Sequence, residues 1–231
     1  SNKKLLVTQR NELDLTDANK VNLWFSENKP NIVICAAAKV GGIFANNEKP
    51  VNFLLENLKI QNNLIESSFK FGVKRFLFLG SSCIYPKASK QPIKEEYLLN
   101  DYLEDTNQWY AIAKISGLKL CEAFRKQYNF DAISLMPTNL YGPNDNYQLK
   151  GSHVMAALIR KFYEAKKNNL STVTCWGTGM PLREFLYVED FAEACLFSLR
   201  YWNPSDNNAP KDKNGNSLKW LNIGSNYEIS I

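Results

Sequence analysis

The sequence lacks the glycine-rich turn with which doubly wound α/β proteins usually bind a dinucleotide. It contains 11 glycines, but none in a Gly-x-Gly-x-x-Gly or Gly-x-x-Gly-x-x-Gly pattern, and the first are Gly41 and Gly42. Such a turn normally follows the first strand and places a helix N-terminus against the pyrophosphate. Either the chain is not a dinucleotide binder, or its strand, turn and helix have been cut away before Ser1.

Long apolar runs and clustered cysteines are also missing. The longest apolar stretches, such as 32–38, are far too short to span a bilayer, and the N-terminus has no signal-peptide core, so we expect no membrane partner. The five cysteines have no Cys-x-x-Cys spacing. We interpret them as reduced thiols of a cytoplasmic protein, mostly buried as small apolar groups, and we assign no metal ligands.

The charge is only mildly positive. Lys and Arg number 28 against 23 Asp and Glu, a net charge of +5. This balance suits an anionic ligand, but no dense basic stripe is present, and we expect no nucleic-acid partner. At 231 residues the chain is long enough for one large domain, or one domain with a small appendage.

The first part of the chain alternates between strand-like and helix-like segments, which implies a parallel, doubly wound α/β sheet. A helix from Asp17 to Asn28 has Thr16 or Asp17 as its N-cap. The predicted strands are 5–8, 31–37, 74–79 and 131–136, and the other predicted helices are 51–71 and 110–128. Continuous apolar strands of this kind are typical of a sheet buried on both faces.

The pattern loosens after Pro137. We predict a polar loop at 139–151, a helix at 153–166, a strand at 172–176, a turn at 177–179, a helix at 189–201 and a last strand at 218–223. Residues 1–143, with 185–201 and 218–224, are expected to form a Rossmann-like domain without its first strand. Residues 144–184 and 225–231 are expected to form part of a small substrate-binding subdomain, and 203–217 a mobile surface insertion.

Two short motifs suggest chemistry on a carbonyl. An apolar strand runs into Gly80-Ser81-Ser82-Cys83, and Tyr110 and Lys114 follow, four residues apart and therefore on one helix face. An ammonium near a phenol lowers the phenol's pKa, so we expect Tyr110 to exchange protons with an oxygen on a reacting carbon. Tyr-x-x-x-Lys alone is a weak signal, and the preceding Gly-Ser-Ser strand end strengthens it.

Several stretches together resemble the GDP-L-fucose synthase family, two-step epimerase/reductases among the extended short-chain dehydrogenases. The matching stretches are 36–43, 79–87, 110–114, 137–143, 152–154 and 176–185, in the family's order. Tyr-x-x-x-Lys and Tyr-Gly-Pro are shared with generic relatives, whereas Gly-Ser-Ser-Cys-Ile-Tyr-Pro-Lys and the later histidine are more specific. The resemblance implies a fragment that begins just after the family's Gly-rich turn and stops short of its C-terminal segment.

The resemblance implies the reaction and its cofactor. GDP-4-keto-6-deoxy-mannose would be epimerised at C3 and C5 and then reduced at C4 by NADPH. The implied catalytic residues are Ser81, Cys83, Tyr110, Lys114 and His153. The implied NADP(H)-binding residues are Arg10, Asp14, Leu15, Ala37, Ala38, Lys39, Leu79, Gly80, Ser81, Ser82, Lys114, Pro137, Thr138, Asn139, Leu140 and His153. The implied GDP-sugar contacts are Lys161, Trp176 and Arg183.

Each implied catalytic role has a structural alternative. Ser81 and Tyr110 would stabilise an enolate oxygen, while Cys83 and His153 would remove and return the proton, with His153 as the acid. A thiol pKa near 8.5 and an imidazole pKa near 6.5 would suit that exchange. Cys83 has the alternative of a buried apolar residue, His153 of a helix cap, Ser81 of a turn residue, and Tyr110 with Lys114 of an exposed pair.

The binding roles also have alternatives. Arg10 would meet the 2′-phosphate of NADP but has the alternative of a surface residue, and Asn139 has that of a loop tether. Trp176 has the alternative of core packing. Lys161 stands where the family commonly has Arg, so it keeps the charge but loses the bidentate fork, which leaves its substrate contact in doubt.

Two rival functions remain open at the level of sequence. One is another extended short-chain dehydrogenase that acts on nucleotide sugars, such as a 4-epimerase or a 4,6-dehydratase. The other is a non-catalytic nucleotide-binding or assembly module, in keeping with the missing Gly-rich turn. The family commonly forms homodimers, and the long helices at 51–71 and 109–128 offer a face for one.

Overall fold

A parallel sheet forms the centre of the molecule. The computed structural model describes residues 4–148 and 151–231. Its main sheet has the order β1-β2-β3-β6, with β1 at Ile32–Cys35, β2 at Arg75–Leu79, β3 at Ala132–Pro137 and β6 at Trp220–Ile223. The expected α/β class with a parallel sheet is confirmed, and each of these strands lies inside or within one residue of its predicted range.

Alternation along the strands divides the core into two parts. In β2, Phe76 and Phe78 face a cluster with Leu118, whereas Leu77 faces the other side of the sheet. In β3, Ile133 also faces that second side. Because side chains of a strand point alternately to the two faces, a continuous apolar run fills both layers.

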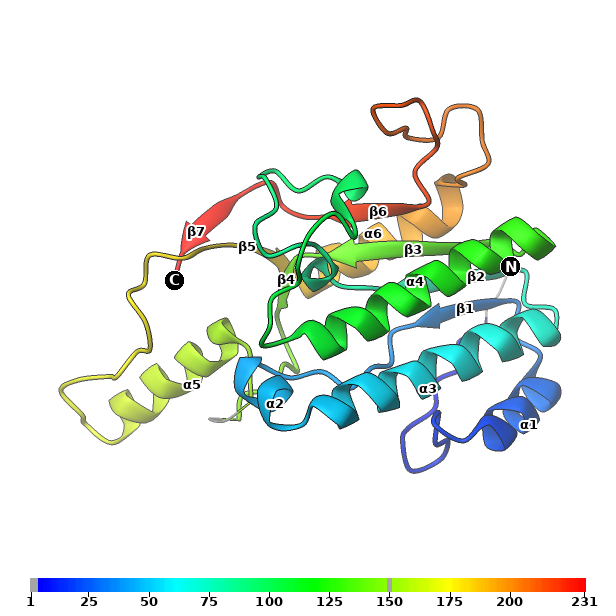
Figure 1. Ribbon diagram of the computed structural model, residues 1–231. Helices are drawn as coiled ribbons and strands as arrows, with labels where there is room; N and C mark the ends of the chain where they lie inside the picture. The colour runs from blue at the N-terminus through cyan, green and yellow to red at the C-terminus, as the bar shows by residue number, and fades with distance from the viewer. Residues whose placement is uncertain (1–3, 149–150) are drawn as a thin grey trace.

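Helices cover both faces of the sheet. α3 (Pro50–Lys70) and α4 (Gln108–Tyr128) pack side by side on one face, with α1 (Ala18–Asn28) against α3, and α6 (Val188–Tyr201) lies on the opposite face (Figure 1). Asp17 is the N-cap of α1, since its carboxylate accepts hydrogen bonds from the backbone N–H groups of Asn19 and Lys20. The expected helices are all present.

The expected strand at 5–8 does not form. These residues are irregular, and Leu5 and Val7 are exposed. A strand needs a neighbour to accept its hydrogen bonds. In the described residues β1 is an edge strand, paired only with β2, and its residues Ile32 and Ile34 are exposed. The prediction was wrong because periodicity does not supply the pairing partner.

A smaller second sheet was not predicted. β4 (Asn139–Tyr141), β5 (Leu182–Tyr187) and β7 (Glu228–Ser230) form it in the order β4-β5-β7, with β4 parallel and β7 antiparallel to β5. β4 occupies part of the predicted polar loop at 139–151, of which 149–150 lie outside the described residues. The predicted strand at 172–176 is irregular, and the regular strand begins at Leu182.

Shorter helices complete the chain. α2 (Ile43–Glu48), η1 (Ser82–Ile84) and η2 (Glu95–Tyr97) were not predicted, whereas α5 (Val154–Lys167) follows the predicted helix at 153–166. α2 and the start of α5 lie on the side of the sheet to which the strand arrows point (Figure 1).

The segment at 203–217 is held by several contacts. Arg125 donates to the Asn203 side chain at 3.2 Å and to the Ser205 hydroxyl at 3.1 Å, and Lys213 forms an ion pair of 3.3 Å with Glu96. Its mobility and the division into two domains remain predictions. The second sheet joins β4, which lies inside the expected main domain, to β7 in the expected subdomain.

Candidate functional site

The Gly-Ser-Ser-Cys motif forms a tight turn at the carboxyl end of β2. Ser81 is the N-cap of the single-turn helix η1, and its hydroxyl accepts a hydrogen bond of 3.4 Å from the backbone N–H of Cys83. Gly80 leaves room for the Met136 side chain, whose sulfur would lie 2.2 Å from a Cβ at this position. Parallel sheets bind ligands beyond the carboxyl ends of their strands, so this turn is well placed for a site.

Lys114 joins the two motifs. Its side chain is 3% exposed, and its ammonium donates a hydrogen bond of 2.8 Å to the carbonyl oxygen of Leu79, the last residue of β2. The ammonium also lies 4.9 Å from the ring centre of Phe78 and 5.8 Å from that of Tyr110. Tyr110 and Lys114 are therefore one group at the end of β2, and not an exposed helical pair.

The expected direction of the Tyr110 pKa is wrong for this structure. Burial raises the pKa of Tyr110, and the neighbouring Cys83 and Cys35 act in the same direction. Burial also lowers the pKa of Lys114. The Lys114 ammonium donates to the Leu79 carbonyl, and removal of the Tyr110 phenol from water is the largest cause of its raised pKa.

Cys83 likewise differs from expectation. Burial raises the pKa of the Cys83 thiol to about 11, although the Ser81 hydroxyl and the charge of Lys114 act in the opposite direction. Cys83 therefore holds its proton at neutral pH, whereas a pKa near 8.5 was expected. Half-buried beside Ser81 and Lys114, it differs from Cys35 and Cys121, which are buried in the core cluster.

Gly117 allows α4 to approach β2 closely. A Cβ at Gly117 would lie 2.5 Å from the Phe78 ring and 2.8 Å from the Gln61 amide. The Gln61 side chain, 2% exposed, donates a hydrogen bond of 2.7 Å to the carbonyl of Ala113, the residue before Lys114. The sequence analysis missed both residues, since their signal is contact between segments far apart in the chain.

Asn57 holds the loop after β1. Its side-chain oxygen accepts from the Lys39 N–H at 2.8 Å, and its nitrogen donates to the Lys39 carbonyl at 3.0 Å and to the Phe53 carbonyl at 2.7 Å. This buried amide therefore fixes the end of the Ala37–Lys39 segment, which the sequence assigned to the cofactor. A polar residue on the apolar face of α3 was the available signal, and it was missed.

Arg10 and Lys39 meet at one carboxylate. Glu56 lies 3.1 Å from the Lys39 ammonium and 3.7 Å from the Arg10 guanidinium, and the Arg10 side chain is 86% exposed. Burial alone would raise the pKa of Glu56, but hydrogen bonds from Asn52 and Lys39 and the two positive charges lower it. The structure thus brings Arg10 and Lys39 together, with the guanidinium open to solvent.

Two other expected cofactor residues, Asp14 and Leu15, take part in hydrogen bonds near the start of the chain. Asp14 accepts hydrogen bonds from the backbone and hydroxyl of Thr16, which lower its pKa, and the Leu15 carbonyl accepts from Asn63 at 2.9 Å. Both lie in the loop before α1, and their contacts stabilise that loop.

At the end of β3 the expected residues include one unpaired group. Thr138 follows Pro137, and its buried hydroxyl has no hydrogen-bond partner among the described residues. Asn139 donates a hydrogen bond of 2.9 Å to the Glu184 carbonyl, which matches its alternative as a loop tether. Leu140 packs against the second core cluster.

His153 is the N-cap residue of α5. It is exposed, and its side chain makes no capping hydrogen bond. The preceding loop contacts the glycines after β1, where the Gly42 N–H donates to the Gly151 carbonyl at 2.9 Å. None of the hydrogen bonds within residues 4–148 and 151–231 joins His153 to Cys83, Tyr110 or Lys114, so its catalytic role stays a prediction.

Two of the three expected substrate contacts lie together. The Lys161 ammonium lies 4.7 Å from the ring centre of Trp176 and donates a hydrogen bond of 2.9 Å to the Thr174 carbonyl. Trp176 is 77% exposed, which argues against core packing. Arg183 is apart from this pair in β5, where it donates to the Leu182 carbonyl at 2.7 Å.

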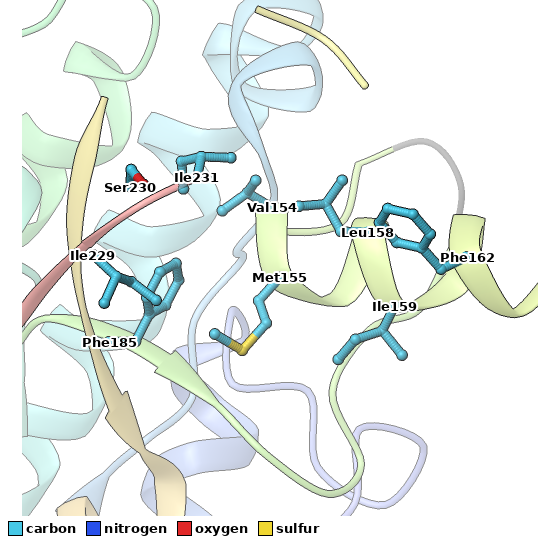
Figure 2. Close-up of a pocket in the computed structure, with 9 residues that line it drawn as sticks. All are labelled: Val154, Met155, Leu158, Ile159, Phe162, Phe185, Ile229, Ser230 and Ile231. Carbon is cyan, nitrogen blue, oxygen red and sulfur yellow. The ribbon is translucent and has the colours of Figure 1, made fainter. Parts of the chain in front are cut away.

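An apolar groove separates α5 from β5 and β7. Its volume is about 420 Å³, and Figure 2 shows apolar side chains of α5 across from Phe185 and Ile229 of the two strands.

Within the described residues no helix meets the length and apolarity of a membrane span, and no group of three or more His, Cys, Asp and Glu could hold a metal.

The fold is a doubly wound α/β sheet. At its strand ends a buried Lys lies beside a Tyr and next to a Ser-x-Cys turn, and these features together match a known class of protein. Residues 1–210 match the model of the NAD dependent epimerase/dehydratase family. The chain belongs to this family.

Individual relatives narrow the comparison. The chain is 54% identical over 227 residues to GDP-L-fucose synthase 1 of Arabidopsis thaliana, covering 98% of this chain and 66% of that protein. It is 44% identical over 230 residues to GDP-L-fucose synthase of Escherichia coli, covering 99% and 70%. A GDP-L-fucose synthetase of Naegleria fowleri bound to NADP is similar in structure, with a TM-score of 0.80 and 30% identity, covering 95% of this chain and 67% of that one. The chain spans about two thirds of the length of these relatives.

Proposed function

We propose that this chain carries the reaction centre of an NADPH-dependent enzyme that converts GDP-4-keto-6-deoxy-D-mannose to GDP-L-fucose. The observation that carries the proposal is the Lys114–Leu79 contact, which places the Tyr110 and Cys83 motifs at one strand end. The similarity to GDP-L-fucose synthases over 98% of the chain supports this substrate over other nucleotide sugars.

The residues present fit the nicotinamide half of NADPH. Lys114 offers a buried ammonium, and Thr138, at the carboxyl end of β3, offers a hydroxyl that has no partner within residues 4–148 and 151–231. The exposed Arg10 guanidinium would hold the 2′-phosphate, which selects NADP over NAD. When bound, NADPH supplies a hydride for C4. Residues 1–231 contain no Gly-rich turn for its pyrophosphate, so we expect weak or no NADPH binding by this chain alone.

Epimerisation needs proton removal beside a ketone. The enolate spreads its charge to oxygen, where the Ser81 hydroxyl and the Tyr110 phenol donate hydrogen bonds. We assign removal and return of the proton to Cys83 and His153. The Cys83 thiol acts as a base only after losing its own proton, and the nearby Lys114 charge favours that loss. His153 then returns a proton from the opposite face.

Reduction at C4 requires a proton for the new alkoxide. Tyr110 holds its proton firmly, because burial raises its pKa, and so it can donate that proton to the C4 oxygen. Lys114, held at the Leu79 carbonyl, orients the ring of Tyr110 and would contact the nicotinamide ribose.

Isotope exchange and NADPH oxidation separate these roles. In D₂O, the protein encoded by the complete gene should produce a sugar with deuterium at C3 and C5 and should consume one NADPH per turnover. Cys83→Ser should lower the exchange rate by at least about a hundredfold, whereas Tyr110→Phe should lower NADPH oxidation more than it lowers exchange, because Tyr110 donates to the enolate oxygen as well as to the C4 alkoxide. Turnover of the keto sugar without net NADPH consumption would contradict the synthase proposal and leave another extended short-chain dehydrogenase as the alternative.

We also propose a homodimer through α3 and α4. Val51 and Leu55 of α3 and Trp109 and Ile112 of α4 are exposed apolar residues on these adjacent helices. Sedimentation equilibrium should give a dimer mass, and Leu55→Lys should shift the population to monomer. A monomer at micromolar concentration would contradict the proposal.

A further inference from the structure

A buried polar network joins the Cys83 turn to the last strand of the main sheet. Tyr85 ends the turn and is 4% exposed. Its hydroxyl donates a hydrogen bond of 2.6 Å to the Asn222 side-chain oxygen and accepts one of 3.1 Å from the Trp220 indole N–H. The turn lies at the end of β2, whereas both partners belong to β6. The hydroxyl therefore bridges parts of the chain that are remote in sequence.

Asn222 holds a second part of the same region. Its backbone N–H donates to the Glu95 carboxylate at 2.8 Å, and its side-chain nitrogen donates to the Ile93 carbonyl at 3.0 Å. Ile93 and Glu95 belong to segment 86–107, which connects the Cys83 turn to α4 and thus to Tyr110. One side chain therefore contacts both the end of the turn and the middle of the connection.

The turn is weakly held by its own hydrogen bonds. Within it, the Ile84 N–H reaches the Ser81 carbonyl at 3.3 Å, the Tyr85 N–H reaches the Ser82 carbonyl at 3.3 Å, and the Ser81 hydroxyl lies 3.4 Å from the Cys83 nitrogen. These distances exceed the usual 2.7–3.2 Å of N–H···O bonds, and a single 3₁₀ turn has poor geometry. The fixed position of Cys83 therefore depends on the Tyr85 anchor.

We propose that Tyr85 and Asn222 are positioning residues that fix Cys83 relative to Tyr110 and Lys114. The network joins four polar groups in one chain, from the Trp220 N–H through the Tyr85 hydroxyl and the Asn222 amide to the Ile93 carbonyl. Buried networks of this kind specify one arrangement, because each lost partner leaves another group unpaired. The catalytic consequence rests on the proposed function, whereas the positional claim does not.

Alkylation of Cys83 tests the positional claim without substrate. In a Cys175→Ser background, which removes the exposed thiol, the rate of iodoacetamide labelling of Cys83 is followed by peptide mass spectrometry against pH. Burial raises the pKa of this thiol, whereas the Ser81 hydroxyl and the Lys114 charge lower it, and the thiol in turn raises the pKa of Tyr110. In the parent, half-maximal labelling is expected at a pH of about 11.

Tyr85→Phe is expected to loosen the turn and admit water to the thiol. The labelling midpoint should fall by about one pH unit or more, and labelling at pH 8 should rise by about tenfold. The matched control is Tyr102→Phe, which removes a hydroxyl from segment 86–107 at a side chain that is 89% exposed, and should change neither value. Trp220→Phe removes the indole N–H together with part of the ring, leaves the Tyr85–Asn222 hydrogen bond in place, and should give a smaller change in the same direction.

The outcomes separate the positional claim from the proposed function. Unchanged labelling in both Tyr85→Phe and Trp220→Phe, with native circular dichroism, would overturn the proposal, and Trp220→Phe decides if Tyr85→Phe fails to fold. In the product of the complete gene, Tyr85→Phe should lower kcat for deuterium exchange by about tenfold with KM nearly unchanged. Altered labelling with unaltered turnover would support the anchor and overturn the role of Cys83.

Discussion

The ammonium of Lys114 in α4 donates a hydrogen bond to the carbonyl of Leu79, the residue that ends β2. This contact places the Tyr-x-x-x-Lys helix at the Gly-Ser-Ser-Cys turn, and the side chain is nearly removed from water. Burial lowers the pKa of Lys114, so the fold retains a charge that its surroundings disfavour. Functional sites commonly retain such stability costs.

Replacement of Lys114 should therefore raise stability while removing activity. When folding lowers the pKa of an amine, the folded protein is destabilised at low pH, because the unfolded chain binds the proton more strongly. The destabilisation is complete below the folded pKa. Lys114→Met should have a higher unfolding free energy than the parent at pH 6, and the gap should narrow as pH rises through the folded pKa toward the ordinary 10.5. Urea unfolding from pH 6 to 10 measures the gap.

Lys119→Met is the control for this measurement. Lys119 lies on the same helix, is 45% exposed and pairs with Glu122 at 2.7 Å, so its loss should cost at most about 1 kcal/mol. A gap for Lys114→Met that does not vary with pH would contradict the argument from burial of its charge.

Removal of the Asn57 amide should destabilise the loop after β1. Asn57→Ala leaves the Lys39 N–H and carbonyl without their partner, which predicts a loss of about 2–4 kcal/mol in unfolding free energy. Asn52 lies on the same helix but is exposed, and its side chain donates to Glu56, so Asn52→Ala should cost less than about 1 kcal/mol. Equal losses in the two variants would show that the hydrogen bonds between Asn57 and Lys39 add nothing to the unfolding free energy.

Gly117→Ala should destabilise the protein although alanine favours helices. The new methyl group would meet the Phe78 ring at 2.5 Å, and overpacking of this kind costs about 1–3 kcal/mol. Phe78→Leu, which removes the ring atom in conflict, should recover part of the loss in the double variant. Additive effects of the two substitutions, measured by thermal unfolding, would refute a direct contact.

Lys161→Arg should strengthen GDP binding if Lys161 and Trp176 contact the nucleotide. Arginine keeps the stacking over the indole and adds a fork that fits phosphate oxygens, so we expect a Kd about threefold to tenfold lower by calorimetry. Lys166→Arg, in the last turn of the same helix, serves as the matched control. A Kd equal to that of the parent would remove Lys161 from the binding site.

Sequence patterns predicted the sheet better than they predicted the site chemistry. The strands ending at Leu79 and Pro137 and the helix containing Lys114 were found because apolar periodicity reports burial directly. The predicted strand at 5–8 was wrong because pairing depends on a neighbour. The lowered pKa expected for Tyr110 and the ordinary pKa expected for Cys83 were wrong because desolvation depends on what packs around each group. The roles of all the catalytic, cofactor-binding and substrate-binding residues remain predictions.

By itself, the sequence determined the class of fold, the order of the core elements and the residue types available for proton transfer, since these depend on local pattern and residue chemistry. Only the tertiary structure decided that Lys114 contacts Leu79, that Asn57 holds Lys39, and that Tyr85 reaches Asn222. Each is a contact between segments distant in the chain, and local periodicity carries no information about which distant groups meet. The absence of a Gly-rich turn is visible in the sequence, whereas the position of β1 at the edge of the described sheet is visible only in the structure.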